Sequence, residues 1–131
     1  MIKKIFLFIL NNTNANLSCK IINFFYFFRE TKFFFDKQKN LLFAKEKERI
    51  RYFSDKMRGF YLYRYGIIFR GIEIAKSYFI DKINFKKDEI IIDIGANYGD
   101  LSIYFDKLNV KLICHNFEPE KNAFKALKLN N

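Results

Sequence analysis

The chain has 131 residues, a formal net charge of +10, and 50% hydrophobic and 20% aromatic residues. This length allows one small domain or part of a larger one, and the apolar content excludes a disordered chain or a linker. The only cysteines, Cys19 and Cys114, lie far apart, which excludes a disulfide framework and a zinc-binding cysteine pattern and favours a reducing compartment.

The positive charge is concentrated in the first half of the chain. Residues 1–70 contain 15 Lys/Arg and 5 Asp/Glu, whereas residues 71–131 contain 9 of each. The first half also holds 18 of the 26 Phe and Tyr residues. We therefore divide the chain into a basic, aromatic N-terminal region (1–70), mostly helical with an extended piece near 60–70, and a neutral α/β segment (71–131).

The opening segment is similar to the start of a signal peptide but lacks two of its features. Its apolar run, Ile5–Leu10, has six residues, whereas a working apolar region has roughly 7–15. The polar residues that follow, Asn11–Asn16, offer no convincing cleavage site. We therefore expect a cytoplasmic location, with membrane association or secretion as the alternatives.

Residues 17–36 are predicted to form a helix that is apolar nearly all round. Charged residues interrupt the segment, which is too short to span a bilayer, since a span needs about 20 apolar residues. Such a helix either packs on another part of its own domain or lies on a membrane surface. Peripheral membrane contact through residues 21–35 would be supported by the nearby basic residues Lys20, Arg29, Lys32, Lys37 and Lys39.

Residues 41–58 are predicted to form a second helix, with apolar side chains on one face and charged ones on the other. Gly59 is expected to end this helix. The next residues, 60–71, are aromatic and β-branched and are interrupted at Gly66, which predicts a short hairpin or two extended pieces. A helix is predicted again over residues 72–80.

The C-terminal segment alternates strands and helices. Three consecutive isoleucines open residues 90–94, which predicts a buried parallel strand, and residues 99–107 carry a helical pattern. A second strand over 110–117 and a second helix over 119–129 follow. This order is typical of a right-handed crossover unit in an open α/β sheet.

The turn after the first of these strands, Asp93–Gly99, is the predicted ligand site. Its glycine spacing is G-x-x-x-G, with Asn97 in place of the second glycine of the G-x-G-x-x-G pattern that binds a pyrophosphate. The carboxylate of Asp93 also repels phosphates and attracts cations. S-adenosylmethionine fits both features, because it carries an adenosine, an ammonium and a sulfonium but no phosphate.

An acidic residue follows the second strand. Glu118 lies 25 residues after Asp93, close to the offset of roughly 20 residues expected of an acid that accepts the ribose hydroxyls. Gly95 would allow the backbone to approach a ligand closely, and Gly99 would let the helix begin against the strand. The alternative is that Asp93 and Asn97 only tie down the turn.

With these residues the chain resembles the FkbM family of S-adenosylmethionine-dependent methyltransferases, which have a Rossmann-like class I fold. The resemblance covers roughly residues 60–131. The matching positions are Phe69, Arg70, Tyr78, Asp88, Ile92–Gly99, Phe117–Pro119, Asn122, Leu127 and Asn130. It implies methylation of a hydroxyl on a sugar or other small metabolite, so a small molecule or glycan is the expected acceptor.

The resemblance also assigns roles to the site residues. It implies that Gly95, Ala96, Asn97 and Gly99 line the methionine part of the cofactor, that Asp93 lies near its ammonium, and that Glu118 holds the ribose. No catalytic base and no metal ligand is assigned.

The remaining polar residues carry weaker expectations. His115 lies inside a predicted strand, so we expect a structural or surface role, and Cys114 is expected to be a small core residue. Arg64 and Arg70 could contact an anionic acceptor or be solvated.

Family members continue with further strands and a later Asp-x-Glu-Gly-type motif that this sequence lacks. The chain is therefore interpreted as the N-terminal piece of a methyltransferase, truncated or split and inactive alone. The alternative is a basic, non-enzymatic module that binds a membrane surface or a nucleic acid, since basic residues attract phosphates and aromatic rings stack on bases. No nucleic-acid-binding motif is recognisable, so a nucleic-acid partner is not expected.

Overall fold

The computed structural model describes residues 2–131. The helices and strands run in the order α1 (Ile2–Asn12), α2 (Ala15–Phe25), β1 (Lys32–Asp36), β2 (Leu41–Glu46), β3 (Arg49–Phe53), α3 (Lys56–Tyr63), α4 (Ile67–Ser77), the 3-10 helix η1 (Ile80–Lys82), β4 (Ile90–Ile94), α5 (Asp100–Phe105), β5 (Ile113–Phe117) and α6 (Lys121–Asn130). Strands β1, β2 and β3 form an antiparallel sheet, and β4 and β5 form a parallel pair, so the described chain is a mixed α/β protein.

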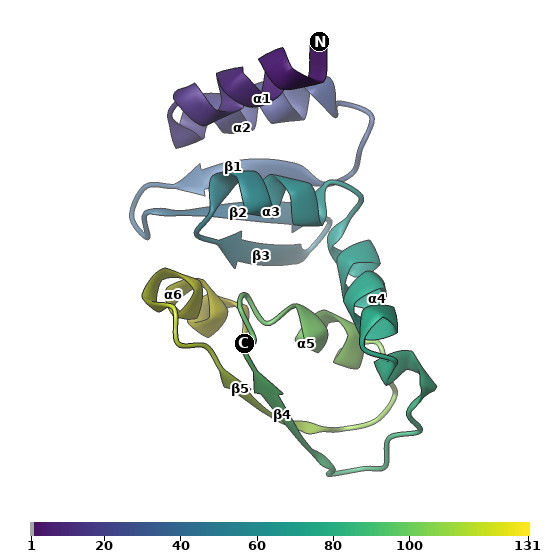
Figure 1. The fold of residues 1–131 in the computed structure, drawn as a ribbon. Helices are drawn as coiled ribbons and strands as arrows, with labels where there is room; N and C mark the ends of the chain where they lie inside the picture. The colour runs from purple at the N-terminus through teal and green to yellow at the C-terminus, as the bar shows by residue number, and fades with distance from the viewer. Residues whose placement is uncertain (1) are drawn as a thin grey trace.

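The N-terminal sheet lies between helices at both of its edges (Figure 1). At the β1 edge, the side chain of Asn23 in α2 accepts a hydrogen bond from the Phe33 N–H and donates one to the Phe33 carbonyl, both at 2.8 Å. At the β3 edge, Asn130 in α6 accepts from the Tyr52 N–H at 2.8 Å and donates to its carbonyl at 3.0 Å. Each asparagine thus takes the place of a neighbouring strand and satisfies groups that an open edge would leave exposed.

The core of the N-terminal region is aromatic. The rings of Phe33, Phe53 and Phe60 meet edge to face with centroids 5.0–6.3 Å apart, a favoured arrangement for aromatic pairs. A Cβ on Gly59 would lie 2.0 Å from the Phe53 ring, so only glycine lets α3 come this close to β3. Because α3 continues to Tyr63, Gly59 lies inside the helix, and its prediction as a helix end is wrong.

The predicted helix over 41–58 is also wrong, because this segment forms the hairpin β2–β3 and the start of α3. Leu42, Ala44 and Phe53 turn inward with the period of two that belongs to a strand. The charged residues between the strands form the exposed hairpin turn, where Lys47 adopts a left-handed φ of 54°. The charged residues of this turn gave the same sequence pattern as the charged face of a helix.

Two further predictions in the N-terminal region need correction. Only the first part of residues 17–36 is helical, since α2 ends at Phe25 and β1 begins at Lys32. The predicted extended pieces within 60–71 are helical, because α3 and α4 occupy most of that segment.

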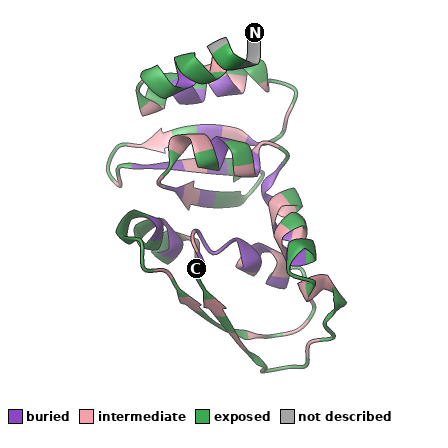
Figure 2. Ribbon diagram, in the orientation of Figure 1, coloured by how far each residue is buried: buried purple, intermediate pink, exposed green. Residues whose placement is uncertain are grey.

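The C-terminal order of strand, helix, strand and helix is confirmed, and β4 pairs in parallel with β5. The predicted burial of β4 is wrong: Ile90, Ile92 and Ile94 are 62%, 63% and 82% exposed. Figure 2 shows this sheet as largely exposed and intermediate, in contrast to the buried centre of the molecule. Cys114 in β5 is likewise exposed rather than in the core.

None of the helices in residues 2–131 combines the length and the apolar content needed to cross a lipid bilayer.

The N-terminal region is joined to the C-terminal unit by buried polar contacts. The Asp100 carboxylate, 3% exposed, accepts a hydrogen bond of 2.5 Å from the Tyr63 hydroxyl and one of 2.8 Å from Arg70 Nε. Arg51, also buried, donates to the Asn130 carbonyl at 2.6 Å and to the Ser102 hydroxyl at 3.0 Å. A buried charge is costly unless it is paired, so these contacts fix how α3 and α4 sit against α5, and how β3 sits against α5 and α6.

We predict that Asn130→Ala destabilises the chain. The substitution removes the two bonds to Tyr52 and a third, of 2.8 Å, to the Tyr98 carbonyl. Leaving these half-buried groups unpaired costs about 1–3 kcal/mol of unfolding free energy, measurable by urea denaturation. Lys121→Ala, at an exposed position of the same helix, serves as the control and should change it by less than about 0.5 kcal/mol. Equal effects of the two substitutions would contradict the bridging role of Asn130.

Candidate functional site

The turn after β4 has an unusual backbone. Gly95, Asn97 and Gly99 have φ values of 80°, 51° and 77°, all in the left-handed region that favours glycine and tolerates asparagine. The N–H groups of Gly95 and Ala96 both donate to the Phe117 carbonyl, at 2.8 and 3.0 Å. The turn is therefore folded back onto the end of β5.

Glu118 fastens this turn to the next loop. One of its carboxylate oxygens accepts a hydrogen bond of 2.7 Å from the Asn97 N–H, and the other accepts one of 2.8 Å from the Glu120 N–H. A carboxylate oxygen can accept two bonds, so each oxygen keeps capacity for a further donor. Glu118 thus has a structural role and is also able to bind a hydroxyl.

Asp93 lies on β4 beneath the turn and is half-buried. Burial raises the pKa of its carboxyl above the ordinary value of 3.8, and the neighbouring charges of Asp100 and Glu118 raise it further. For the side chains that the structure describes, no hydrogen bond to this carboxyl compensates for the burial. A group held in such an unfavourable environment is a functional-site candidate, because a cationic ligand would relieve it.

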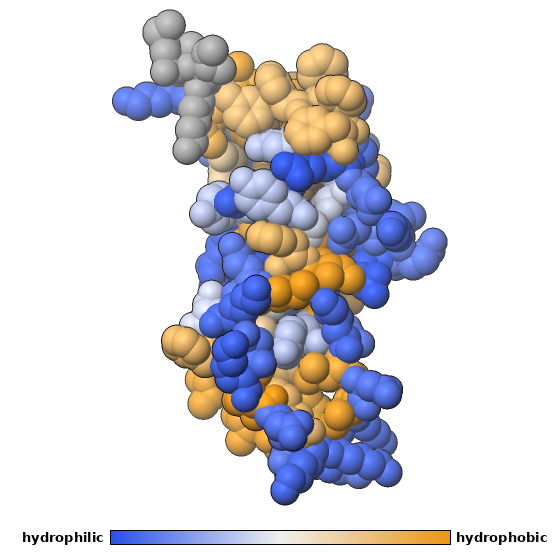
Figure 3. Space-filling view, turned by 90° about the vertical axis from the view of Figure 1, so that its right-hand side faces the viewer, coloured by the Kyte–Doolittle hydropathy of each residue, from blue (hydrophilic) through white to orange (hydrophobic). Residues whose placement is uncertain are grey.

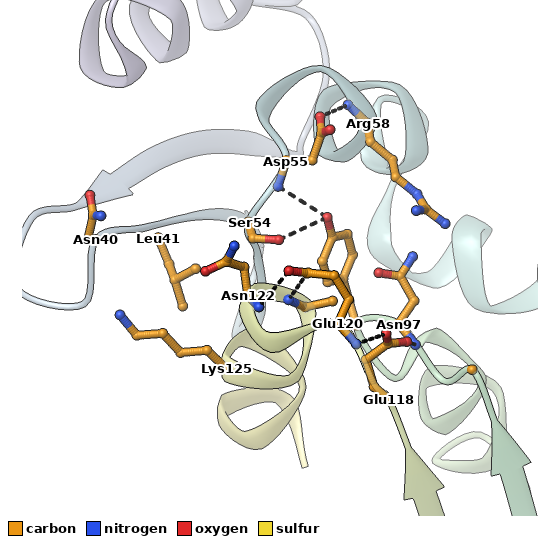
Figure 4. A pocket seen from close by; sticks show the side chains of 13 residues that line it. Asn40, Leu41, Ser54, Asp55, Arg58, Asn97, Glu118, Glu120, Asn122 and Lys125 are labelled. Carbon is orange, nitrogen blue, oxygen red and sulfur yellow. Dashed lines mark hydrogen bonds between the residues drawn. The ribbon is translucent and has the colours of Figure 1, made fainter.

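A cavity of about 710 Å³ opens beside the turn (Figure 4). Its lining residues come from the N-terminal sheet, α3, the turn and α6: Asn40, Leu41, Ser54, Asp55, Arg58, Gly95, Asn97, Tyr98, Glu118, Glu120, Asn122, Ala123 and Lys125. Ligand sites commonly have volumes of about 300–1,000 Å³. The cavity therefore has the size of a small-molecule site, and both halves of the chain build it.

The predicted site residues occupy three positions relative to this cavity. Gly95, Asn97 and Glu118 line it, and a Cβ placed on Gly95 would meet no atom within 4 Å. Ala96 and Gly99 are buried behind the lining. Asp93 does not line the cavity, but its carboxyl is close enough to that of Glu118, which does, for the charge of Glu118 to raise its pKa.

Gly99 is the N-cap of α5, with a left-handed φ of 77°, as expected of a glycine at which the helix begins. A Cβ at this position would also lie 2.7 Å from a methyl group of Leu127, so Gly99 makes room for α6 as well.

Ionised groups of both signs surround the cavity. The carboxylates belong to Asp55, Glu118 and Glu120, and the cations to Arg58 and Lys125. The backbone N–H groups of Asn122 and Ala123 lower the pKa of Glu120, which caps α6 with its carboxylate. Because a carboxylate already occupies the start of α6, this helix N-terminus is not free to bind a phosphate.

Tyr98 connects the two walls of the cavity. Its side chain is 2% exposed, and its hydroxyl accepts a hydrogen bond of 3.1 Å from the Asp55 N–H and lies 3.4 Å from the Ser54 hydroxyl. Asp55 begins α3, where its side chain accepts from the Arg58 N–H at 2.8 Å. The Arg58 guanidinium extends from α3 toward Asn97 (Figure 4).

Sequence reasoning missed the N-terminal wall of the cavity. Ser54-Asp55 before an apolar segment is a helix N-cap signal. The predicted helix over 41–58 includes both residues, so it places them inside a helix and not at the start of one. No local signal indicates that this N-cap lies opposite the glycine turn, because the Tyr98 contact that brings them together spans 43 residues.

The other polar candidates lie elsewhere. Arg70 is paired with Asp100 and Glu73, and Arg64 stacks on the Tyr61 and Tyr65 rings, so neither lines the cavity. His115 is exposed on β5. In the described part of the chain, no group of three or more His, Cys, Asp or Glu side chains is placed to hold a metal ion.

Comparisons of the chain with models of protein families, with curated proteins and with solved structures gave no significant match. The resemblance to the FkbM family therefore stays a prediction that rests on the motif residues.

We predict that Asp93→Asn stabilises the chain. Stability from the neutral Asp93 carboxyl is fully present below its ordinary pKa of 3.8 and is lost as the pH rises through the raised pKa of the folded state. The substitution should therefore raise the urea midpoint at pH 7, with a smaller gain as the pH is lowered toward 4. Glu48→Gln, at an exposed position, is the control and should shift the midpoint little. A loss of stability at pH 7 would show instead that the Asp93 carboxylate stabilises the turn.

Proposed function

We propose that the cavity beside the Asp93–Gly99 turn binds S-adenosylmethionine, and that the chain carries the cofactor-binding part of a Rossmann-like methyltransferase of the FkbM type. The acceptor in this proposal is a hydroxyl group of a sugar or another small metabolite. When bound, the cofactor supplies a methyl group carried on a positively charged sulfur.

The observation that carries the proposal is the cluster of carboxylates around the glycine turn. Asp93, Asp100 and Glu118 are close enough for the latter two to raise the pKa of the first. Asp100 is neutralised by Arg70, whereas Asp93 has no basic partner among the described ion pairs. This arrangement favours a cationic ligand over a nucleotide with phosphates.

The lining of the cavity is compatible with the individual parts of this cofactor. The open space at Gly95 allows a ligand to approach the backbone, and the free acceptor capacity of Glu118 suits ribose hydroxyls. Asp93, whose carboxyl is coupled to that of Glu118, would add negative charge that stabilises an ammonium nearby.

The N-terminal wall supports a hydroxyl-rich acceptor. Asn40 and Ser54 present neutral amide and hydroxyl groups to the cavity from this wall, and Asn122 of α6 adds an amide from the other side; such groups both donate and accept hydrogen bonds. The lining contains few apolar side chains, Leu41 and Ala123 among them, so a sugar suits it better than an apolar substrate.

We predict that the 131-residue chain binds S-adenosylmethionine and does not bind ATP, as measured by titration calorimetry at pH 7. Glu118→Ala and Asp93→Asn should each weaken binding more than tenfold, or about 1.4 kcal/mol. Glu118→Ala also removes two bonds that hold the turn, so its effect alone does not isolate ligand contact.

Asp93→Asn supplies the decisive comparison, because it is expected to raise stability while it lowers affinity. Glu48→Gln removes an equivalent charge at an exposed position outside the cavity and should leave affinity unchanged. No binding of S-adenosylmethionine, or equal binding of ATP, would refute the proposed function.

A further inference from the structure

We propose that the chain docks on the surface of an anionic phospholipid bilayer through an aromatic patch at the end of α2. The patch consists of Phe24, Phe25, Phe27 and Phe28, which are 75%, 55%, 77% and 63% exposed. Figure 3 shows apolar side chains gathered at the top of this side of the molecule, over the two N-terminal helices. Contiguous exposed apolar surface of this kind marks an interaction site.

Contacts with α1 and with Lys32 support the patch. The ring of Phe6 in α1 meets that of Phe25 edge to face at 4.6 Å, which joins the two helices at this end. Lys32 donates from its ammonium to the Phe27 carbonyl at 2.8 Å and to the Tyr26 carbonyl at 3.3 Å, which fixes the turn after α2. The exposed rings therefore project from a supported surface.

The charge of this part of the chain favours anionic lipid as the partner. Residues 1–32 contain five Lys/Arg and one acidic residue, Glu30, whose carboxylate lies 3.6 Å from the Lys47 ammonium. Lys20 is exposed and lies one helical turn before Phe24, so both side chains share a face of α2, and Lys4 and Phe8 are related in the same way on α1. Aromatic rings beside basic residues are the composition of segments that lie in the headgroup layer of a membrane.

An apolar groove of about 400 Å³ continues from the patch. Its lining includes Phe6 and Tyr26 beside the patch and Tyr61 and Arg64 from α3. The guanidinium of Arg64 lies over the Tyr61 ring at the groove, so a basic group accompanies apolar surface here as well. The groove extends the surface over which acyl chains and phosphate groups can make contact.

A bilayer suits this surface better than a nucleic acid. Single-stranded nucleic acids stack their bases on rings along a basic groove, whereas these rings cluster at one end of a helical pair. None of the patch residues lines the cavity beside the glycine turn, so docking leaves that cavity accessible. The surface is thus separate from the proposed cofactor site.

The test is co-sedimentation of the full chain with vesicles of phosphatidylcholine containing 30% phosphatidylserine. We expect binding at 0.1 M salt, a loss of about tenfold in partitioning at 0.5 M salt, and a similar loss on vesicles of pure phosphatidylcholine. Phe24→Ser combined with Phe27→Ser should also reduce partitioning by about tenfold, because two large apolar side chains leave the interface.

Phe79→Ser is the matched control, since Phe79 is 73% exposed on a segment outside the patch, and it should bind within about twofold of the unchanged chain. Unchanged far-ultraviolet circular dichroism would show that the patch variant is folded. Failure of the unchanged chain to bind, or equal binding of the patch variant, would overturn the proposal. The proposal would also be overturned if the chain self-associates and the patch variant does not, or if the chain binds a single-stranded oligonucleotide but not vesicles.

Discussion

The structure depends on how the open edge of the N-terminal sheet is closed. Strand β3 ends the sheet, and Asn130 of α6 pairs with the Tyr52 backbone as a further strand would. The same side chain donates to the Tyr98 carbonyl in the glycine turn. Because one amide serves both partners, α6 and the turn dock on the sheet together. The buried pairing of Asp100 with Tyr63 and Arg70 then holds α3 and α4 against α5.

This docking places the glycine turn in one wall of a two-walled cavity. The glycine turn supplies one wall, and the start of α3 supplies the other through the contact between Tyr98 and Asp55. Asp93 lies below with its pKa raised by burial and by two neighbouring carboxylates. The folded chain thus maintains an unfavourable negative charge next to the glycine turn, as the proposed binding of a cationic ligand requires.

The C-terminal unit could be predicted from sequence because its signals are local. The isoleucine run, the two glycines and Glu118 at the end of the second strand fix the elements and three of the cavity residues. The N-terminal sheet was missed because the β2–β3 turn contains neither glycine nor asparagine and places lysine in a left-handed conformation. Arg58 and Asp55 could not be placed at the site, since only long-range packing brings them there. The exposure of β4 was missed because an isoleucine run indicates a strand but not what covers it.

Titration of the isotopically labelled chain with S-adenosylmethionine, followed by amide resonances, tests the central claim most directly. We expect the largest shifts on Gly95, Ala96, Asn97 and Glu118, with smaller shifts on Asp55 and Arg58 across the cavity. We also expect no response in β1 or in the aromatic patch of α2. Absence of shifts, or shifts centred outside the cavity, would contradict the assignment of this turn as a cofactor site.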